Sequence, residues 1–241
     1  MSRKAFTLVE LVVVAGVVTL LIAILMPAIG RSRESARQVQ CASNLRQIAV
    51  ALIGYTQDNR GRFPGIATAP QRPWDWVFWM RTQSPLYADF RDAPLMRYLG
   101  KADESILRCP SDDLTTHRPG GGRYREPFPY SYQMNGFTAG ERINCCSLPP
   151  GGKTPSSQIK HASQKILLIE GNEAMVIDGV WVPPLPTSPR FHDLADRHEQ
   201  LQRRPAGGWL TSRGNVAFVD SHVEFVSQTF AHDPAHYDPA W

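Results

Sequence analysis

Residues 6–26 read FTLVELVVVAGVVTLLIAILM, an almost uninterrupted apolar run near the start of a chain of 241 residues. As an α-helix that rises about 1.5 Å per residue, this run is long enough to cross a hydrocarbon core about 30 Å thick. Glu10 is the one charged residue within it. The run therefore predicts a membrane-spanning helix that contains a single carboxylate.

This carboxylate needs a partner, because an ionised carboxylate in lipid costs about 2.5–3.5 kcal/mol on insertion scales. Upstream of it, Arg3 and Lys4 form a basic start, and the small residue Ala5 directly precedes Phe6. Cleavage after Ala5 would create a new α-amine on Phe6. That amine could neutralise Glu10 of a neighbouring identical helix, so the segment has the features of an assembly element as well as an anchor.

Helical patterning continues beyond Pro27. Apolar residues recur every three or four positions up to about residue 53, as on one face of an amphipathic helix. These residues are Val39, Ala42, Leu45, Ile48, Ala49, Leu52 and Ile53. Gly61 supplies a stop signal. We expect one helix over about residues 6–59, roughly 80 Å long, with a bend near Pro27 and its second half packed on a sheet.

The rest of the chain has the pattern of a loop-rich head. The density of Gly and Pro between residues 118 and 152 indicates irregular loops. Asp220-Ser221 separates the last two expected strands like a two-residue hairpin turn, and Asp178-Gly179 is a similar signal within the segment 175–182. The expected strands are Lys165–Glu170, Met175–Val182, Asn215–Asp220 and His222–Val226. We therefore expect an α+β fold in which the long helix packs on a C-terminal antiparallel sheet with long loops.

Composition excludes several classes of function. The 26 Lys and Arg residues against 22 Asp and Glu residues give a net charge of +4. This small excess is no polybasic surface, so we expect no nucleic-acid partner. The sequence contains no GxSxG motif, P-loop or GxGxxG motif, and no paired motif for a nucleophile and a base. The chain is thus not expected to be an enzyme.

One dense group of possible metal ligands surrounds residue 198. It consists of Asp193, Asp196, His198, Asp220 and His222. Oxygen-rich loops suit calcium, although the spacing of an EF-hand and the HExxH motif are both absent. The alternation of the last strand is equally the pattern of an ordinary solvated face. Calcium at this group and no cofactor at all both remain open.

The four cysteines are too few for a dense disulfide framework. Cys41 falls on the apolar stripe of the helix, where we expect a small core residue. The adjacent pair Cys145 and Cys146 could bridge each other only with strain. The expected disulfide therefore joins Cys109 to Cys145 or to Cys146.

The segment RKAFTLVELVVVAGVVTLLIAILMPAI (residues 3–29) closely resembles the N-terminal signal of type IV prepilins and type II secretion pseudopilins. In those proteins a prepilin peptidase cleaves before the Phe and methylates the new amine, and the helix remains as membrane anchor and assembly core. The resemblance implies cleavage between Ala5 and Phe6, N-methylation of Phe6, a role for Glu10 in assembly register and a helix kink at Pro27. The family usually has Gly where this chain has Ala5. Some pseudopilins bind calcium in C-terminal loops, so the resemblance implies calcium as a candidate ligand of this head.

This resemblance also implies an organisation and a location. Its parts are a leader over residues 1–5, a transmembrane and assembly helix over 6–26, an amphipathic continuation over 27–60 and the head over 61–241. The helix would make a single pass through the bacterial inner membrane, with the head in the periplasm or, after assembly, outside the cell. Expected partners are the prepilin peptidase and other pilin-like subunits in a homo- or hetero-oligomeric filament.

Segments of the head extend the resemblance to a large bacterial family of pilin-like proteins whose C-terminal domain is named for an H-x9-DG motif. The segments that carry it are Leu107–Asp112, Tyr130–Gly136, Lys165–Gly171, Arg197-His198 and Gly214–Phe225. Here the motif is altered. Ser221 follows Asp220 where the family has Gly, and 21 residues separate His198 from Asp220 instead of nine.

Alternatives exist for the N-terminus and for the function. A general secretory signal cleaved near Gly30 would have an apolar region of about 7–15 residues without an acid, and a plain anchor would need no cleavage site. The first hypothesis for function is a pilin-like subunit of a type II secretion or type IV pilus-like filament. The alternative is a membrane-anchored extracytoplasmic protein whose head binds a ligand or polysaccharide. We expect four aromatic residues to lie in the core of the head: Trp74, Trp76, Phe78 and Trp79. If they instead lined an open groove, the structure would favour the ligand-binding alternative.

Overall fold

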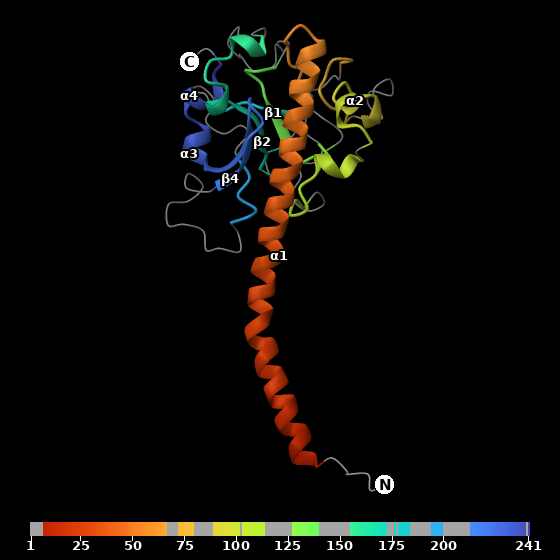
Figure 1. Cartoon of the computed structure of the whole chain (residues 1–241), viewed down its shortest axis with the longest axis vertical. Helices are drawn as coiled ribbons and strands as arrows, with labels where there is room; N and C mark the ends of the chain where they lie inside the picture. The colour runs from red at the N-terminus through yellow and green to blue at the C-terminus, as the bar shows by residue number, and fades with distance from the viewer. Residues whose placement is uncertain are drawn as a thin grey trace.

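In the computed structural model a long helix, α1 (Leu8–Asp58), runs the length of the molecule, and the head gathers around its second half (Figure 1). The first half of α1 projects from the head, with the N-terminus at its far end. The residues that the structure describes are 7–66, 72–79, 89–101, 103–113, 127–139, 155–172, 176, 178–183, 194–199, 213–239 and 241.

Helix α1 confirms the expected long helix. It begins in a capping box, in which the Thr7 side chain accepts a hydrogen bond from the Glu10 amide while the Glu10 carboxylate accepts one from the Thr7 amide. Pro27 lies inside the helix without ending it, and Figure 1 shows a gentle curve of the ribbon rather than a break. Gly61, at φ +73°, donates its N–H to the Thr56 carbonyl at 2.7 Å and closes the C-terminus. With 51 residues, the helix is roughly 77 Å long.

The second half of α1 packs on the sheet through its predicted stripe. Leu45, Ile48 and Leu52 are fully buried, and the helix lies against β4, β2 and β5. Their spacing of three and four residues places them on one face of the helix. Val39, which was expected on this stripe, is instead 66% exposed, because nine residues at 3.6 per turn place it about half a turn around the helix from Ile48, on the opposite face.

The five strands form one mixed sheet in the order β3-β1-β2-β4-β5. Antiparallel pairing joins β1 to β2, β2 to β4 and β4 to β5, whereas β1 and β3 are parallel. The expectation of a purely antiparallel sheet is therefore wrong at this edge. The strands are β1 (Tyr132–Asn135), β2 (Ile166–Glu170), β3 (Val180–Trp181), β4 (Arg213–Phe218) and β5 (Val223–Ser227).

Strand β1 lies inside the segment that was expected to consist of irregular loops. All four of its residues are buried, including the polar Gln133 and Asn135. The amide of Gln133 donates to the Val180 carbonyl at 2.7 Å, and that of Asn135 donates to the Ile166 carbonyl at 2.8 Å. Buried hydrogen bonds thus satisfy side chains that, by composition alone, look like loop residues.

Both faces of the sheet are covered. Along β4, Ala217 packs in the cluster that contains α1, whereas Val216 and Phe218 pack on the opposite side with Tyr237. This alternation is the two-residue period of a strand buried on both faces. The short helices are α2 (Met96–Leu99), α3 (Gln228–Ala231) and α4 (Pro234–Tyr237), with 3-10 turns η2 (Phe90–Asp92), η3 (Glu104–Leu107), η4 (Ser156–Gln158) and η5 (Ala162–Gln164).

The two expected hairpin turns have different outcomes. Asp178 and Gly179 form a bend that leads into β3, which pairs in parallel with β1, while residues 173–175 and 177 of the expected first arm lie outside the described residues. The turn at Asp220-Ser221 does join two antiparallel strands, but the connection from the end of β4 to the start of β5 has four residues, 219–222, instead of two, and the Phe218 amide donates to the His222 carbonyl at 2.9 Å across it. Ser221 has a φ of +73° within this turn, a conformation that favours glycine.

Replacing Ser221 with glycine is expected to raise the free energy of unfolding by about 0.5–1 kcal/mol. The left-handed conformation costs a non-glycine residue about 1–2 kcal/mol, and the greater freedom of glycine in the unfolded chain returns about 0.4–1 kcal/mol of that. Thermal unfolding of the full chain in detergent should show a Tm higher by roughly 1–4 °C. As a control, Ser43→Gly on the exposed face of α1 should lower stability by about 0.5–1 kcal/mol. A lower Tm for Ser221→Gly would contradict the prediction.

Candidate functional site

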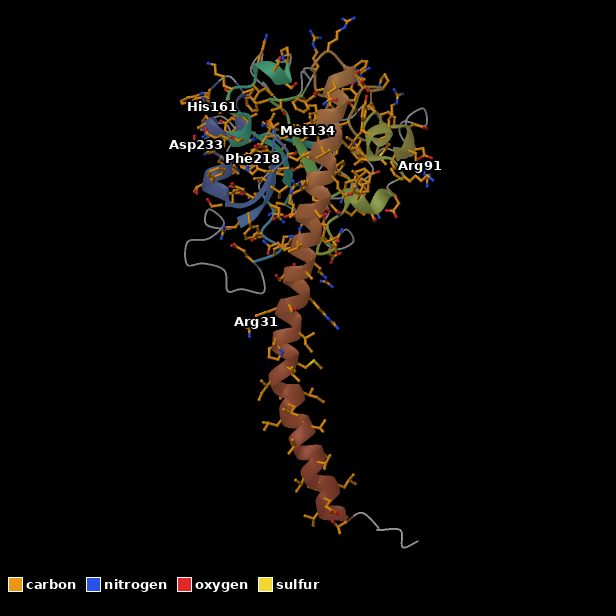
Figure 2. All side chains as sticks on the ribbon, viewed as in Figure 1. Arg31, Arg91, Met134, His161, Phe218 and Asp233 are labelled. Atoms are coloured by element: carbon orange, nitrogen blue, oxygen red, sulfur yellow. A yellow bond between two sulfur atoms is a disulfide. The ribbon has the colours of Figure 1, made fainter. Side chains whose placement is uncertain are left out.

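The first half of α1 is an exposed apolar surface. Every residue from 8 to 33 is exposed, and Leu8 reaches 77%. Figure 2 shows the side chains of this segment radiating from the ribbon with no other part of the described chain beside them. By length and composition α1 can cross a membrane. Because so large an apolar surface is unstable in water, this half of the helix is consistent with a single-pass membrane anchor.

Glu10 is hydrogen-bonded within its own helix. Its Oε2 accepts from the Thr7 amide at 2.9 Å and from the Thr7 hydroxyl at 2.8 Å. The capping box therefore satisfies part of this carboxylate but supplies no positive charge. Ala5 and Phe6 lie outside the described residues, as does the rest of the leader, so the pairing of Glu10 with a Phe6 amine stays a prediction.

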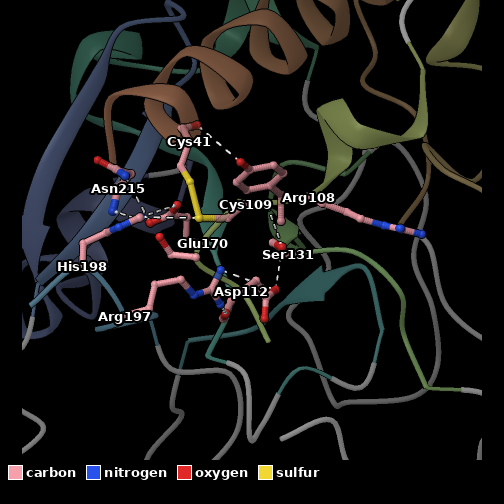
Figure 3. Close-up of polar contacts among 12 residues, drawn as sticks. Cys41, Arg108, Cys109, Asp112, Ser131, Glu170, Arg197, His198 and Asn215 are labelled. Atoms are coloured by element: carbon pink, nitrogen blue, oxygen red, sulfur yellow. Dashed lines mark hydrogen bonds and ion pairs between the residues drawn. A yellow bond between two sulfur atoms is a disulfide. The ribbon is translucent and has the colours of Figure 1, made fainter. Parts of the chain in front are cut away.

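A second feature, which we call the polar junction, lies where α1 enters the head (Figure 3). It is a group of buried polar and sulfur-containing side chains between α1, β2, β4 and three connecting segments. Its members are Glu34, Cys41, Cys109, Asp112, Ser131, Glu170, Arg197, His198 and Asn215. Glu34 marks the boundary, since it is the first buried residue of α1 after the exposed half.

His198 is the centre of the polar junction. Its Nδ1 lies 2.8 Å from Glu34 Oε1 on α1, and its Nε2 lies 3.2 Å from Glu170 Oε1 at the end of β2. The Ser111 hydroxyl also donates to Glu34 Oε1 at 2.6 Å. One imidazole thus links the helix to the sheet through two carboxylates that are far apart in the sequence.

Two opposing effects act on the pKa of His198. Burial lowers the pKa, but the hydrogen bonds and negative charges of Glu170 and Glu34 outweigh this effect and hold it above its ordinary value. The protonated ring donates to both carboxylates, whereas a neutral ring has a single N–H and could serve only one of them. The two carboxylates therefore favour the protonated form of His198.

The remaining charges of the junction are also paired. The Glu170 Oε2 atom accepts from the amide and the side chain of Asn215, each at 3.2 Å. Arg197 lies 3.4 Å from Asp112 and donates to the Gly171 carbonyl at 2.7 Å. These contacts explain how several charges can be buried together, since an unpaired buried charge would be strongly destabilising.

A disulfide joins Cys41 on α1 to Cys109, so the expected pairing of Cys109 with Cys145 or Cys146 is wrong. Cys41 is fully buried, as expected of the apolar stripe, but it is not a simple core residue. The physical reason is the docking of α1, which brings two cysteines 68 residues apart to a Cα–Cα distance of 5.1 Å. Cys145 and Cys146 lie outside the described residues.

The group of metal ligands expected around residue 198 is divided in the structure. Asp193 lies outside the described residues, Asp196 is half-buried, and His198 belongs to the polar junction. Asp220 and His222 pair with each other in the β4–β5 turn. Asp220 lies in the turn beyond the end of β4, whereas Asn215, which contacts Glu170 of the junction, lies within β4. The described members therefore form two separate places rather than one site.

At the β4–β5 turn the local interactions account for both side chains. Partial burial raises the pKa of Asp220, but the hydrogen bonds from His222 outweigh this and hold it below its ordinary value. The His222 ring also stacks on Phe218, with 4.2 Å between ring centroids. The pair therefore has a structural role in the turn.

The aromatic residues of the head lie mostly in the core. Trp76, Phe78 and Trp79 are buried, as expected, and Trp79 packs edge-to-face on Phe128 with 5.4 Å between centroids. Trp74 differs from the expectation, since it is 40% exposed. The three buried rings are committed to packing and offer no surface to a ligand.

Together these features define an α+β protein with a long N-terminal helix. The first half of this helix is apolar and exposed, and the polar junction attaches the second half to the head. A model of the family described as "Protein of unknown function (DUF1559)" matches residues 31–196, about two thirds of the chain. The protein therefore belongs to this family. The match starts where the exposed apolar half of α1 ends, and it includes Glu34, Cys41, Cys109 and Glu170 of the junction. No curated protein and no solved structure matches the chain significantly.

Sequence reasoning identified His198 as a candidate but assigned it the wrong neighbours. Glu34 and Glu170 were not proposed as partners, because 164 and 28 residues separate them from His198. One feature of the sequence could have indicated Glu34 as a partner: it is an acidic residue close to the start of the apolar stripe of α1.

Truncating Glu170 tests whether the junction holds the fold together. Glu170→Ala is expected to lower the free energy of unfolding by about 3–5 kcal/mol, because it leaves His198 and Asn215 without their buried partner. Glu224→Ala, on the exposed part of β5, should cost less than about 1 kcal/mol. Denaturant unfolding of the full-length, disulfide-bonded protein in detergent measures both. Equal losses for the two variants would contradict the role of the junction.

Proposed function

We propose that this protein is a pilin-like (pseudopilin) subunit. A prepilin peptidase processes it, the apolar half of α1 holds it in the bacterial inner membrane, and the same surface then packs into a type II secretion or type IV pilus-like filament. The observation that carries this proposal is the continuity of α1. One helix joins a fully exposed apolar half to a half that is fastened to the head.

Continuity matters because a simple tether does not require it. A tethered binding domain functions equally well when a flexible linker separates the span from the head. Here the helix passes from residue 8 to residue 58 without interruption, and a disulfide and buried ion pairs fix its second half to the head. Helix packing in a filament would thus set the position of every head.

The alternatives have less support. A secretory signal cleaved near Gly30 would divide a continuous helix within its exposed half. A ligand-binding head that uses its aromatic residues would need them at the surface, but Trp76, Phe78 and Trp79 are buried. We therefore place the membrane-anchored binding protein second.

The proposal gives Glu10 a role in axial register. Its capping partner Thr7 is neutral, so the carboxylate would remain a net charge in the membrane. After cleavage before Phe6, the new amine would lie four residues before Glu10 in the sequence and could neutralise Glu10 of an adjacent subunit. A wrong stagger would leave the carboxylate without a cation, at a cost of about 2.5–3.5 kcal/mol.

A pair of Glu10 variants separates charge from capping. Glu10→Gln keeps an N3 residue that can complete the capping box but removes the charge, whereas Glu10→Ala removes both. Both variants should insert into the membrane and be processed, and both should fail to assemble. The measurement is the yield of sheared filaments or of inter-subunit cross-links in a host that contains the cognate machinery. Assembly of Glu10→Gln at the wild-type level would remove the argument from charge.

Intact mass spectrometry tests the proposal as a whole. The protein is purified from membranes of a host with its cognate prepilin peptidase. The expected mass corresponds to loss of residues 1–5 and addition of one methyl group at Phe6. An intact N-terminus would indicate a simple anchor, and cleavage near Gly30 would indicate a secreted protein, so either result would overturn the proposal.

A further inference from the structure

Four potential metal ligands converge in the polar junction. The sulfur atoms of Cys41 and Cys109, a carboxylate oxygen of Glu170 and a ring nitrogen of His198 all lie within 4.8 Å of one another. All four residues are buried. They come from α1, from the segment 103–113, from β2 and from the segment 194–199, and Figure 3 shows them facing a common centre.

Their chemistry is that of a structural zinc site. Two thiolates, one imidazole and one carboxylate form a mixed sulfur, nitrogen and oxygen set, which zinc binds in tetrahedral geometry. Calcium and magnesium prefer oxygen ligands alone. Because all four ligands come from the protein and are buried, no position would remain open for water, as in structural rather than catalytic zinc sites.

The atoms behind the ligands provide a second, independent observation. His198 presents Nε2 to the sulfur of Cys109 at 3.5 Å, while its Nδ1 is held by the Glu34 carboxylate at 2.8 Å. Glu170 presents Oε1 to the same centre, while its Oε2 is held by Asn215. Carboxylates that hold the far nitrogen of a ligating histidine are typical of metal sites, where they fix the orientation of the ring.

We propose that the reduced form of this protein binds one zinc ion through Cys41, Cys109, His198 and Glu170. The disulfide and the metal exclude each other. Two sulfur atoms that each lie about 2.3 Å from a tetrahedral zinc are roughly 3.8 Å apart, which is too far for a covalent bond between them. Zinc displaces the two thiol protons and the proton on Nε2 of His198, and nothing is oxidised or reduced in that step. The thiols are those of the newly made chain, or they arise when a dithiol reductant opens the disulfide and is itself oxidised.

The two states would hold α1 in the same place. In the disulfide-bonded state, a covalent bond and the His198 imidazolium link the helix to the head. In the zinc state, one divalent cation would take over the cross-link between the same cysteines and the contact with Glu170. The junction would thus keep α1 docked before as well as after the disulfide forms. This inference does not depend on the proposed function.

The first test compares two redox states of the same full-length protein in detergent. One sample is reduced with a phosphine under anaerobic conditions and the other keeps its disulfide; each is then mixed with zinc chloride and freed of unbound metal. Elemental analysis should give one zinc per chain in the reduced sample and none in the oxidised sample. No zinc in the reduced sample, or equal amounts in both, would overturn the proposal.

Variants distinguish these ligands from the other cysteines. Cys145→Ser combined with Cys146→Ser should retain one zinc per reduced chain, whereas Cys41→Ser should lose it. Cobalt in place of zinc should give a thiolate-to-metal charge-transfer absorption that Cys41→Ser weakens. Retention of zinc by Cys41→Ser together with its loss from the double variant would place the metal elsewhere and refute the site.

Glu34 offers a test that leaves all four ligands intact. As the residue that positions His198, its change to Gln should lower the affinity for zinc by about 10–100-fold without changing the stoichiometry at saturation. Glu224→Gln, a matched change at an exposed carboxylate, should leave the affinity unchanged. Equal affinities for the two variants would contradict the arrangement.

Discussion

The rest of the structure depends on the buried contacts of the polar junction, which attach α1 to the head. His198 lies between Glu34 and Glu170, next to the Cys41–Cys109 disulfide; the His198 and Glu170 side chains are fully buried, and the Glu34 side chain is 11% exposed. Removing one partner of such a buried pair costs about 3–5 kcal/mol. The helix, the sheet and two connecting segments must therefore all be in place at once, which fixes the head rigidly on the helix.

The polar junction divides α1 into two halves with different surroundings. Beyond Glu34 toward the N-terminus, 26 residues of the helix (8–33) are exposed and mostly apolar, and they extend roughly 39 Å from the head. Toward the C-terminus the same helix supplies one wall of the core. Because the two halves belong to one rigid rod, whatever medium covers the apolar half, lipid or other helices, also determines where the head lies.

His198 and the dipeptide Asp220-Ser221, which lie beyond the residues 31–196 that the family model matches, occupy separate places in this fold. His198 belongs to the junction, whereas Asp220 and Ser221 belong to the β4–β5 turn, in which Ser221 has a positive φ. A glycine at position 221 would suit that backbone, because glycine adopts a positive φ without steric cost. His198 therefore contributes to the junction, and Asp220 contributes to the turn through its pairing with His222.

Local pattern determined the helix, its apolar first half and the strands β2, β4 and β5, because periodicity and turn residues act over a few neighbouring positions. It also indicated that His198 was a functional candidate. Only the tertiary structure decided the partners of that residue, the Cys41–Cys109 disulfide and the parallel pairing of β1 with β3. These contacts join residues between 28 and 164 positions apart, and nothing in a single sequence records which distant groups meet when the helix docks. Burial also determined how the charged groups interact. The imidazole of His198 and the carboxylates of Glu34 and Glu170 would be ordinary groups at a protein surface, but in the buried junction they form one hydrogen-bonded unit.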